Sequence, residues 1–194
     1  MIIILEGVNG VGKTTYANIL AKNLELTVYC PFRSGDPNIH RGGRSNFKKN
    51  LEEFHVPYKT HVDDLYVADF LGSTRTSVIL DRSMSSAIAY GQLDRDRWLP
   101  DDMAQLLEFW QSLFQKEKVL YVWLFTSSHD VAYERAMKRS DSFWPLDVDS
   151  FVFLEEEFSA IYDRISLPKL KIDTGYTLLS RGVEKIERAL GVLK

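Results

Sequence analysis

The stretch Gly7-Val8-Asn9-Gly10-Val11-Gly12-Lys13-Thr14 decides the fold. It matches the pattern G-x-x-x-x-G-K-[ST] in full, follows the apolar run 2–5 and opens a helical pattern over 13–24. Glycine lets the backbone curve around an anion without Cβ clashes, so that successive N–H groups point inward. The positive end of the following helix adds to this attraction. The sequence therefore predicts a strand, a phosphate-binding loop and a helix in direct succession.

The loop also supplies candidate contacts for ATP and its magnesium ion. The Lys13 ammonium is expected to reach the β- and γ-phosphates, and the Thr14 hydroxyl to ligate Mg²⁺. Residues 77–81 read as a second buried strand that ends in Asp81, whose carboxylate is expected to hold the same ion through water. Thr14 and Asp81 are thus the predicted metal site. The residues predicted to bind ATP are Gly7, Asn9, Gly10, Val11, Gly12, Lys13, Thr14 and Thr15.

Short apolar runs alternate with helical patterns along the chain. The expected strands lie at 2–5, 26–29, 78–80, 119–125 and, more weakly, 170–172. The expected helices lie at 13–24, 101–114, 131–138, 151–165 and 181–190. This alternation is typical of parallel sheets with right-handed crossovers. The sequence predicts one α/β domain over residues 1–194, with a five-stranded parallel sheet flanked by helices.

Composition narrows the class of partner. The 194 residues are 45% hydrophobic and carry a formal net charge of −3. A chain this mildly acidic is a poor candidate for binding duplex DNA, because that binding depends on clustered Lys and Arg. No apolar stretch approaches the length of a membrane span, and the first residues lack the basic segment of a signal peptide. The single cysteine, Cys30, cannot form an internal disulfide. We therefore expect a cytoplasmic protein with small-molecule substrates and no membrane partner.

Four blocks of sequence resemble the thymidylate kinase family. Residues 5–15 resemble its loop E-G-x-[DE]-G-x-G-K-T-T, and 81–90 resemble its segment D-R-[YH]-x-x-S-x-x-A-[YF]. Residues 65–69 are similar to its L-F-x-A-[DN] helix, and 131–135 to its V-A-x-E-R entry to a mobile lid, here about 138–149. The resemblance implies a P-loop kinase of nucleotide biosynthesis that transfers the γ-phosphate of ATP to a deoxynucleoside monophosphate. It further implies dTMP as acceptor, giving dTDP, Mg²⁺ as cofactor, and a homodimer.

The same resemblance implies roles for individual residues. Lys13, Arg82 and Arg139 would be catalytic. Resembling enzymes with glycine at position 10 carry the catalytic arginine in the lid, and Arg139 is favoured over Arg135 and Lys138 because it is nearest the lid opening. The implied substrate-binding residues are Asn9, Arg33, Tyr66, Arg82, Ser86 and Tyr90.

Three departures from the family pattern leave alternatives open. Asn9 replaces an acidic residue, Ser83 an aromatic or histidine, and Phe70 an arginine. The run Asp81-Arg82-Ser83 is also similar to the Glu-Arg-Ser of deoxynucleoside kinases. A deoxynucleoside kinase, or a kinase of another nucleoside monophosphate, is therefore the alternative enzyme. A nucleotide-dependent switch is the alternative outside enzymes, although the guanine-reading sequence N-K-x-D is absent.

Two further groups of residues are interpreted as unrelated to catalysis. The four histidines show no metal-ligand spacing. The acidic run 155–157 is interpreted as a solvated helix face.

Overall fold

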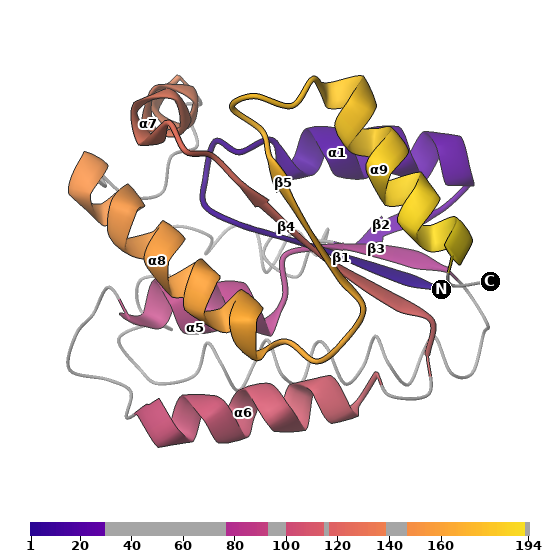
Figure 1. Cartoon of the computed structure of the whole chain (residues 1–194), viewed down its shortest axis with the longest axis horizontal. Helices are drawn as coiled ribbons and strands as arrows, with labels where there is room; N and C mark the ends of the chain where they lie inside the picture. The colour runs from indigo at the N-terminus through magenta and orange to yellow at the C-terminus, as the bar shows by residue number, and fades with distance from the viewer. Residues whose placement is uncertain (30–76, 93–99, 115–116, 139–146, 193–194) are drawn as a thin grey trace, which may run out of the picture.

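The computed structural model describes residues 1–29, 77–92, 100–114, 117–138 and 147–192. Within these ranges, five strands form one parallel sheet in the order β2-β3-β1-β4-β5 (Figure 1). The strands are β1 (Ile2–Glu6), β2 (Thr27–Tyr29), β3 (Val78–Asp81), β4 (Val119–Phe125) and β5 (Lys169–Asp173). Because all strands run the same way, their carboxyl ends meet at one edge of the sheet, where open α/β sheets place ligands.

Helices cover both faces of this sheet. They are α1 (Lys13–Leu24), α5 (Met84–Gln92), α6 (Pro100–Ser112), α7 (His129–Met137), α8 (Val148–Arg164) and α9 (Leu179–Val192). Figure 1 shows α1 and α9 together on one face and α5, α6 and α8 on the other. The helix α7 follows the carboxyl end of β4 and packs against α8.

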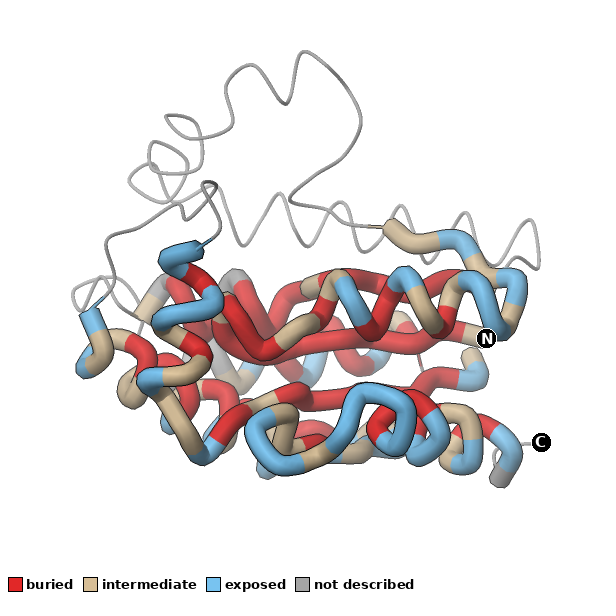
Figure 2. The backbone as a smooth tube through the Cα atoms, turned by 90° about the horizontal axis from the view of Figure 1, so that it is seen from above, coloured by how far each residue is buried: buried red, intermediate tan, exposed pale blue. Residues whose placement is uncertain are grey.

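The central strands are buried from both sides. All five residues of β1 are buried, as are the first six of β4, so these strands read as continuous apolar runs rather than alternating ones. On the α6 side, Trp110 packs edge-to-face on Phe114 and Tyr121, with ring centroids 5.3 and 6.3 Å apart. Figure 2 shows the buried residues gathered between the layers, with exposed residues on the outer helix turns. Burial of each such side chain stabilises the fold by about 1.5–3 kcal/mol.

The predicted α/β architecture and its five-stranded parallel sheet are confirmed. The helix α8 begins at Val148, before the expected 151, because Asp147 caps it by accepting from the Ser150 main-chain N–H at 2.8 Å. The helix α5 was not expected from periodicity. The expected strand at 26–29 begins at Thr27.

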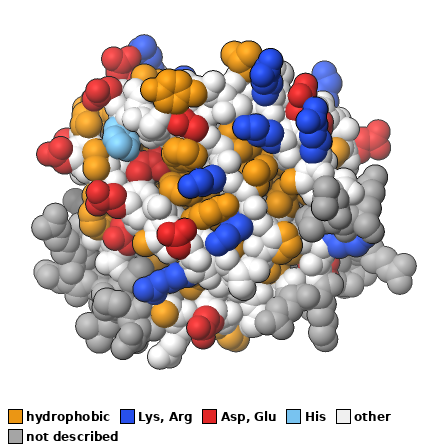
Figure 3. Space-filling model, viewed as in Figure 1, with side chains coloured by type: hydrophobic (Ala, Val, Ile, Leu, Met, Phe, Trp, Pro, Cys, Tyr) orange, Lys and Arg blue, Asp and Glu red, His pale blue; other side chains and the backbone are white. Residues whose placement is uncertain are grey.

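The surface carries both signs of charge. On the face shown in Figure 3, acidic and basic side chains are interspersed, in keeping with the net charge of −3. None of the helices in the described ranges is both long and apolar enough to cross a membrane.

Candidate active site

The phosphate loop, residues 7–14, packs directly against β4 and α7. Gly7 has a φ of 134°, and a Cβ there would lie 2.0 Å from the carbonyl oxygen of Leu124. Gly10 has a φ of 85°, and its Cβ would lie 2.1 Å from the carbonyl oxygen of Ala132. Both positions therefore require glycine on grounds of backbone conformation and of space.

Lys13 is folded into this loop. Its Nζ donates to the carbonyl oxygens of Gly7 and Val8 at 2.8 and 2.7 Å, and the side chain is buried. Burial, followed by the positive charge of Arg82, lowers the pKa of Lys13 to about 7. Phosphate oxygens entering the loop can replace the two carbonyl acceptors and favour the charged ammonium.

Thr14 and Asp81 meet beside the loop. The pairing of β1 with β3 sets Asp81 opposite Leu5, and the Thr14 hydroxyl donates to Asp81 Oδ2 at 2.8 Å. A hydroxyl and a carboxylate are the hard oxygen donors that Mg²⁺ prefers, so the two side chains fit the predicted ion. The described residues contain no cluster of three or more His, Cys, Asp or Glu able to hold a metal. Phosphate oxygens and water would therefore complete the coordination.

Arg82 links the loop to α5. Its φ of 85° is unusual for a non-glycine residue, and its main-chain N–H donates to the Leu5 carbonyl at 3.1 Å. The guanidinium donates to Ser86 Oγ at 3.1 Å and to Asn9 Oδ1. It also lies over the ring of Tyr90, 5.2 Å from its centroid, while the Tyr90 hydroxyl accepts the Asn9 N–H at 3.1 Å. Four residues predicted to bind substrate are thus in mutual contact.

Glu6 is a site residue to which the sequence analysis assigned no role. Its Oε1 accepts from the main-chain N–H and the hydroxyl of Ser83, both at 2.6 Å, and its Oε2 accepts from the Ser86 hydroxyl. The side chain is fully buried, and burial raises its pKa. The sequence signal was present in two parts, an acidic residue directly before the loop and the serines after Arg82.

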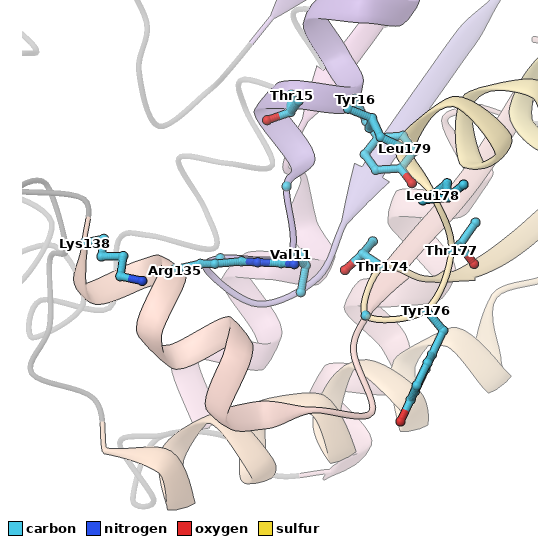
Figure 4. Close-up of a pocket in the computed structure, with 13 residues that line it drawn as sticks. Val11, Thr15, Tyr16, Arg135, Lys138, Thr174, Tyr176, Thr177, Leu178 and Leu179 are labelled. Atoms are coloured by element: carbon cyan, nitrogen blue, oxygen red, sulfur yellow. The ribbon is translucent and has the colours of Figure 1, made fainter.

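A cavity of about 660 Å³ opens beside the loop (Figure 4). Its walls are the loop and the start of α1 (10–12, Thr15 and Tyr16), Arg135 of α7 with the helix C-cap Lys138, and the segment 174–179 that leads from β5 into α9. In Figure 4, Arg135 reaches from α7 toward Val11, facing the segment that carries Thr174 and Tyr176. This volume suits a small organic ligand.

The interpretation of 155–157 as a solvated face is wrong for Glu155. Glu155 is only 7% exposed, whereas Glu156 is exposed. Its Oε1 accepts the main-chain N–H of Thr126 at 3.2 Å. Burial raises the pKa of Glu155 to about 7, against the smaller lowering effects of that hydrogen bond and of the Lys13 charge. The helix α8 turns this carboxylate inward because it packs on α5 and α7.

The predicted residues Lys13, Thr14, Asp81, Asn9, Arg82, Ser86 and Tyr90 are thus gathered at the carboxyl edge of the sheet. Arg33, Tyr66 and Arg139 lie outside the described residues, as does most of the expected lid at 138–149.

No protein-family model matches the sequence, and no curated protein matches it. Solved structures do. A deoxyadenosine kinase from M. mycoides with bound dATP is 17% identical, with a TM-score of 0.69, over 98% of this chain and 100% of that one. The same enzyme with the products dCMP and dCDP is 17% identical, with a TM-score of 0.63, and both chains are covered fully, at 100%.

A third similar structure is the YorR protein from Bacillus subtilis, in complex with phosphorylated GDP. It is 19% identical, with a TM-score of 0.63, over 99% of this chain and 96% of that one. These likenesses show that the chain has the α/β fold of P-loop kinases.

Proposed function

We propose that this protein is a phosphotransferase that moves the γ-phosphate of ATP to a deoxynucleoside or its monophosphate. The observation that carries the proposal is the convergence of Lys13, the Thr14–Asp81 pair and Arg82 around the phosphate loop. Phosphoryl transfer depends on positioning and positive charge, which these groups supply.

ATP is the proposed phosphate donor, and its phosphates and its nucleoside would bind at two neighbouring places. Its phosphates would occupy the loop, with Lys13 on the β- and γ-phosphates and with Mg²⁺ held by Thr14 and, through water, by Asp81. The ion would neutralise charge on the phosphates. The nucleoside part would occupy the cavity between Arg135 and the segment 174–179.

In the reaction, an oxygen of the acceptor forms a bond to the γ-phosphorus while the bond to the β–γ bridging oxygen breaks. ADP leaves with that electron pair. Arg82 is proposed to contact the transferring group from the acceptor side. Its guanidinium is fixed by Ser86 and Asn9, so little side-chain freedom remains to be lost in the transition state.

Between the two acceptor classes, Glu6 favours the deoxynucleoside. A hydroxyl acceptor must lose a proton, whereas a phosphate oxygen is already ionised near neutral pH. Ser86 Oγ accepts from Arg82 and donates to Glu6. An acceptor bound beside Arg82 is therefore connected to the Glu6 carboxylate through the Ser86 hydroxyl. We infer that the acceptor hydroxyl gives its proton to Ser86 Oγ while Ser86 gives its own proton to Glu6, which is buried and reached through this serine. The similar M. mycoides enzyme, a deoxyadenosine kinase solved with dCMP among its products, supports this class.

A nucleoside monophosphate, with dTMP first, is the second candidate acceptor. It is favoured by the resemblance of 5–15 and 81–90 to thymidylate kinases. Arg33 and Tyr66 would then bind the acceptor phosphate and base, and Arg139 would act from the lid.

An acceptor screen tests the proposal. The purified protein is incubated with Mg²⁺-ATP and each deoxynucleoside, deoxynucleoside monophosphate and ribonucleoside monophosphate, and the products are resolved by chromatography. Monophosphate from a deoxynucleoside supports the first acceptor class, and dTDP from dTMP supports the second. Slow release of phosphate and ADP without any phosphorylated acceptor would favour a switch and overturn the kinase.

In the same assay, Glu6→Gln separates the two classes. Gln keeps an oxygen that can accept from Ser83 but cannot take a proton from the acceptor. We expect a loss of about 10²-fold or more in kcat with a deoxynucleoside and a much smaller change with a monophosphate acceptor. Equal losses with both would remove Glu6 from the proton transfer.

A further inference from the structure

Thr126 is the point at which two walls of the nucleotide cavity meet, the helix α7 and the segment 174–179. It directly follows β4 and is almost fully buried, at 1% exposed. On one side its hydroxyl accepts the Ser128 N–H at 3.1 Å, at the start of α7. On the other side, the segment after β5 packs closely against the Thr126 hydroxyl, because a Cβ added to Gly175 would lie 2.8 Å from the hydroxyl oxygen.

The neighbours of Thr126 continue these links. Phe125 accepts from the main-chain N–H and the hydroxyl of Thr174 at 2.8 and 3.1 Å, which fastens the segment 174–179 to the end of β4. The helix α7, which starts here, carries Arg135 to the cavity and contacts Gly10 of the loop through the Ala132 carbonyl. Phe125 and Thr126 thus form a junction between two cavity walls, the helix α7 and the segment 174–179. A shift of this junction would move both walls together.

The Glu155 side chain fixes the main chain of this junction. It reaches from α8 and accepts the buried N–H of Thr126 at 3.2 Å. Its second oxygen, Oε2, is buried without a hydrogen-bond partner. The nearby Trp123 indole slightly lowers the pKa of this carboxyl, but its N–H makes no hydrogen bond to Oε2. The charged groups that act on Glu155 are Lys13 from α1 and Asp173 from β5.

We propose that Glu155 is a positioning residue for the donor nucleotide: by holding the Thr126 N–H, it fixes the junction that sets α7 and the segment 174–179 around the nucleoside. This inference rests on the proposed function, since it takes the cavity as the nucleoside site. Glu155 is not a catalytic residue, because its hydrogen bond goes to the main chain of Thr126, and neither residue lines the cavity.

Glu155→Met tests the proposal by removing the acceptor while keeping a long side chain. An unsatisfied buried N–H costs about 1–3 kcal/mol, so we expect ADP to bind about fivefold or more weakly by calorimetry. Inorganic tripolyphosphate, which fills only the phosphate loop, should lose less than ADP. Glu155→Gln, which keeps the acceptor, should restore ADP binding. Glu156→Met, on the exposed face of the same helix, is the matched control.

Thr126→Val tests the same junction without touching α8. Valine keeps the shape and the N–H but removes the hydroxyl that contacts Ser128 and the Gly175 segment. We expect it, too, to weaken ADP more than tripolyphosphate. This arm remains informative if Glu155→Met does not fold.

Three results would overturn the inference. They are unchanged ADP binding in both Glu155→Met and Thr126→Val, equal losses for ADP and tripolyphosphate, and failure of Glu155→Gln to restore binding. If the unmodified protein binds neither ADP nor tripolyphosphate, the proposed function itself fails, and the two failures are thereby distinguished.

Discussion

The Thr14 hydroxyl donates to Asp81 Oδ2 across 2.8 Å, although 67 positions separate the two residues along the chain. The pairing of β1 with β3 brings them together, because it sets Asp81 opposite Leu5, in the strand that leads into the phosphate loop. With Mg²⁺ and ATP, the same two oxygens would turn to the ion and its water.

Thr14→Val should therefore act through magnesium. Valine keeps the branched shape but offers no oxygen to the ion. We expect kcat to fall about 10–100-fold, the range typical when groups that orient or hold a metal are lost, and the Mg²⁺ concentration for half-maximal rate to rise. Thr27→Val, on the exposed first position of β2, is the control. An unchanged magnesium dependence would place the ion elsewhere.

Lys13→Ala should slow phosphotransfer strongly while the fold stays intact. The ammonium is the one charge enclosed by the described part of the loop, and loss of a single preorganised donor typically costs about 10²–10³-fold in kcat. Burial already penalises this ammonium, so its removal should not lower the melting temperature. Lys22→Ala, on the exposed side of α1, controls for loss of charge. A rate near normal would contradict the phosphate-loop assignment.

The sequence predicted the succession of strand, loop and helix over β1 and α1 well because its signal lies in consecutive residues. The loop needs glycines at fixed positions and a lysine that begins the helix, and neither requirement depends on distant segments. The strands were found almost as well, since burial on both faces makes β1 and β4 continuous apolar runs. Asp81 could be placed because parallel strands end at one edge.

Glu6 and Glu155 were harder to assign because tertiary packing defines their roles. The hydrogen-bond donors to Glu6 lie 77 and 80 positions away, in Ser83 and Ser86. Glu155 stands in a run of three glutamates with the same local chemistry, and only the packing of α8 turns the first of them inward. Periodicity could have raised this possibility, since Phe151, Leu154 and Phe158 share its face.

Glu155→Gln should change how stability depends on pH. Folding raises the pKa of Glu155 from 4.5 to about 7, so the native state binds its proton more tightly than the unfolded chain. The raised pKa of Glu155 contributes stability that is fully present below pH 4.5 and is lost as the pH rises through 7. A shift of this size corresponds to at most about 3 kcal/mol.

Gln cannot ionise and so escapes this loss. Urea unfolding between pH 5 and pH 8 should show the stability of Glu155→Gln gaining on the unmodified protein by about 1–3 kcal/mol toward high pH. Glu156→Gln, at an exposed position, should show no such trend. Parallel curves for Glu155→Gln and the unmodified protein would mean that Glu155 is ionised throughout this range.

Gly10→Ala should weaken nucleotide binding because the loop has no room at this position. The added Cβ would lie 2.1 Å from the Ala132 carbonyl, and the φ of 85° is strained for alanine, so the loop must move away from α7. We expect ADP affinity to fall about tenfold or more, by calorimetry, for a strain of about 1–3 kcal/mol. Gly191→Ala is the matched control, since nothing lies within 4 Å of its added Cβ in α9. There the same methyl should leave ADP binding unchanged and raise the free energy of unfolding by about 0.5–1 kcal/mol, because glycine lowers helix stability. If Gly10→Ala binds ADP normally, the contact between the loop and α7 does not shape the site.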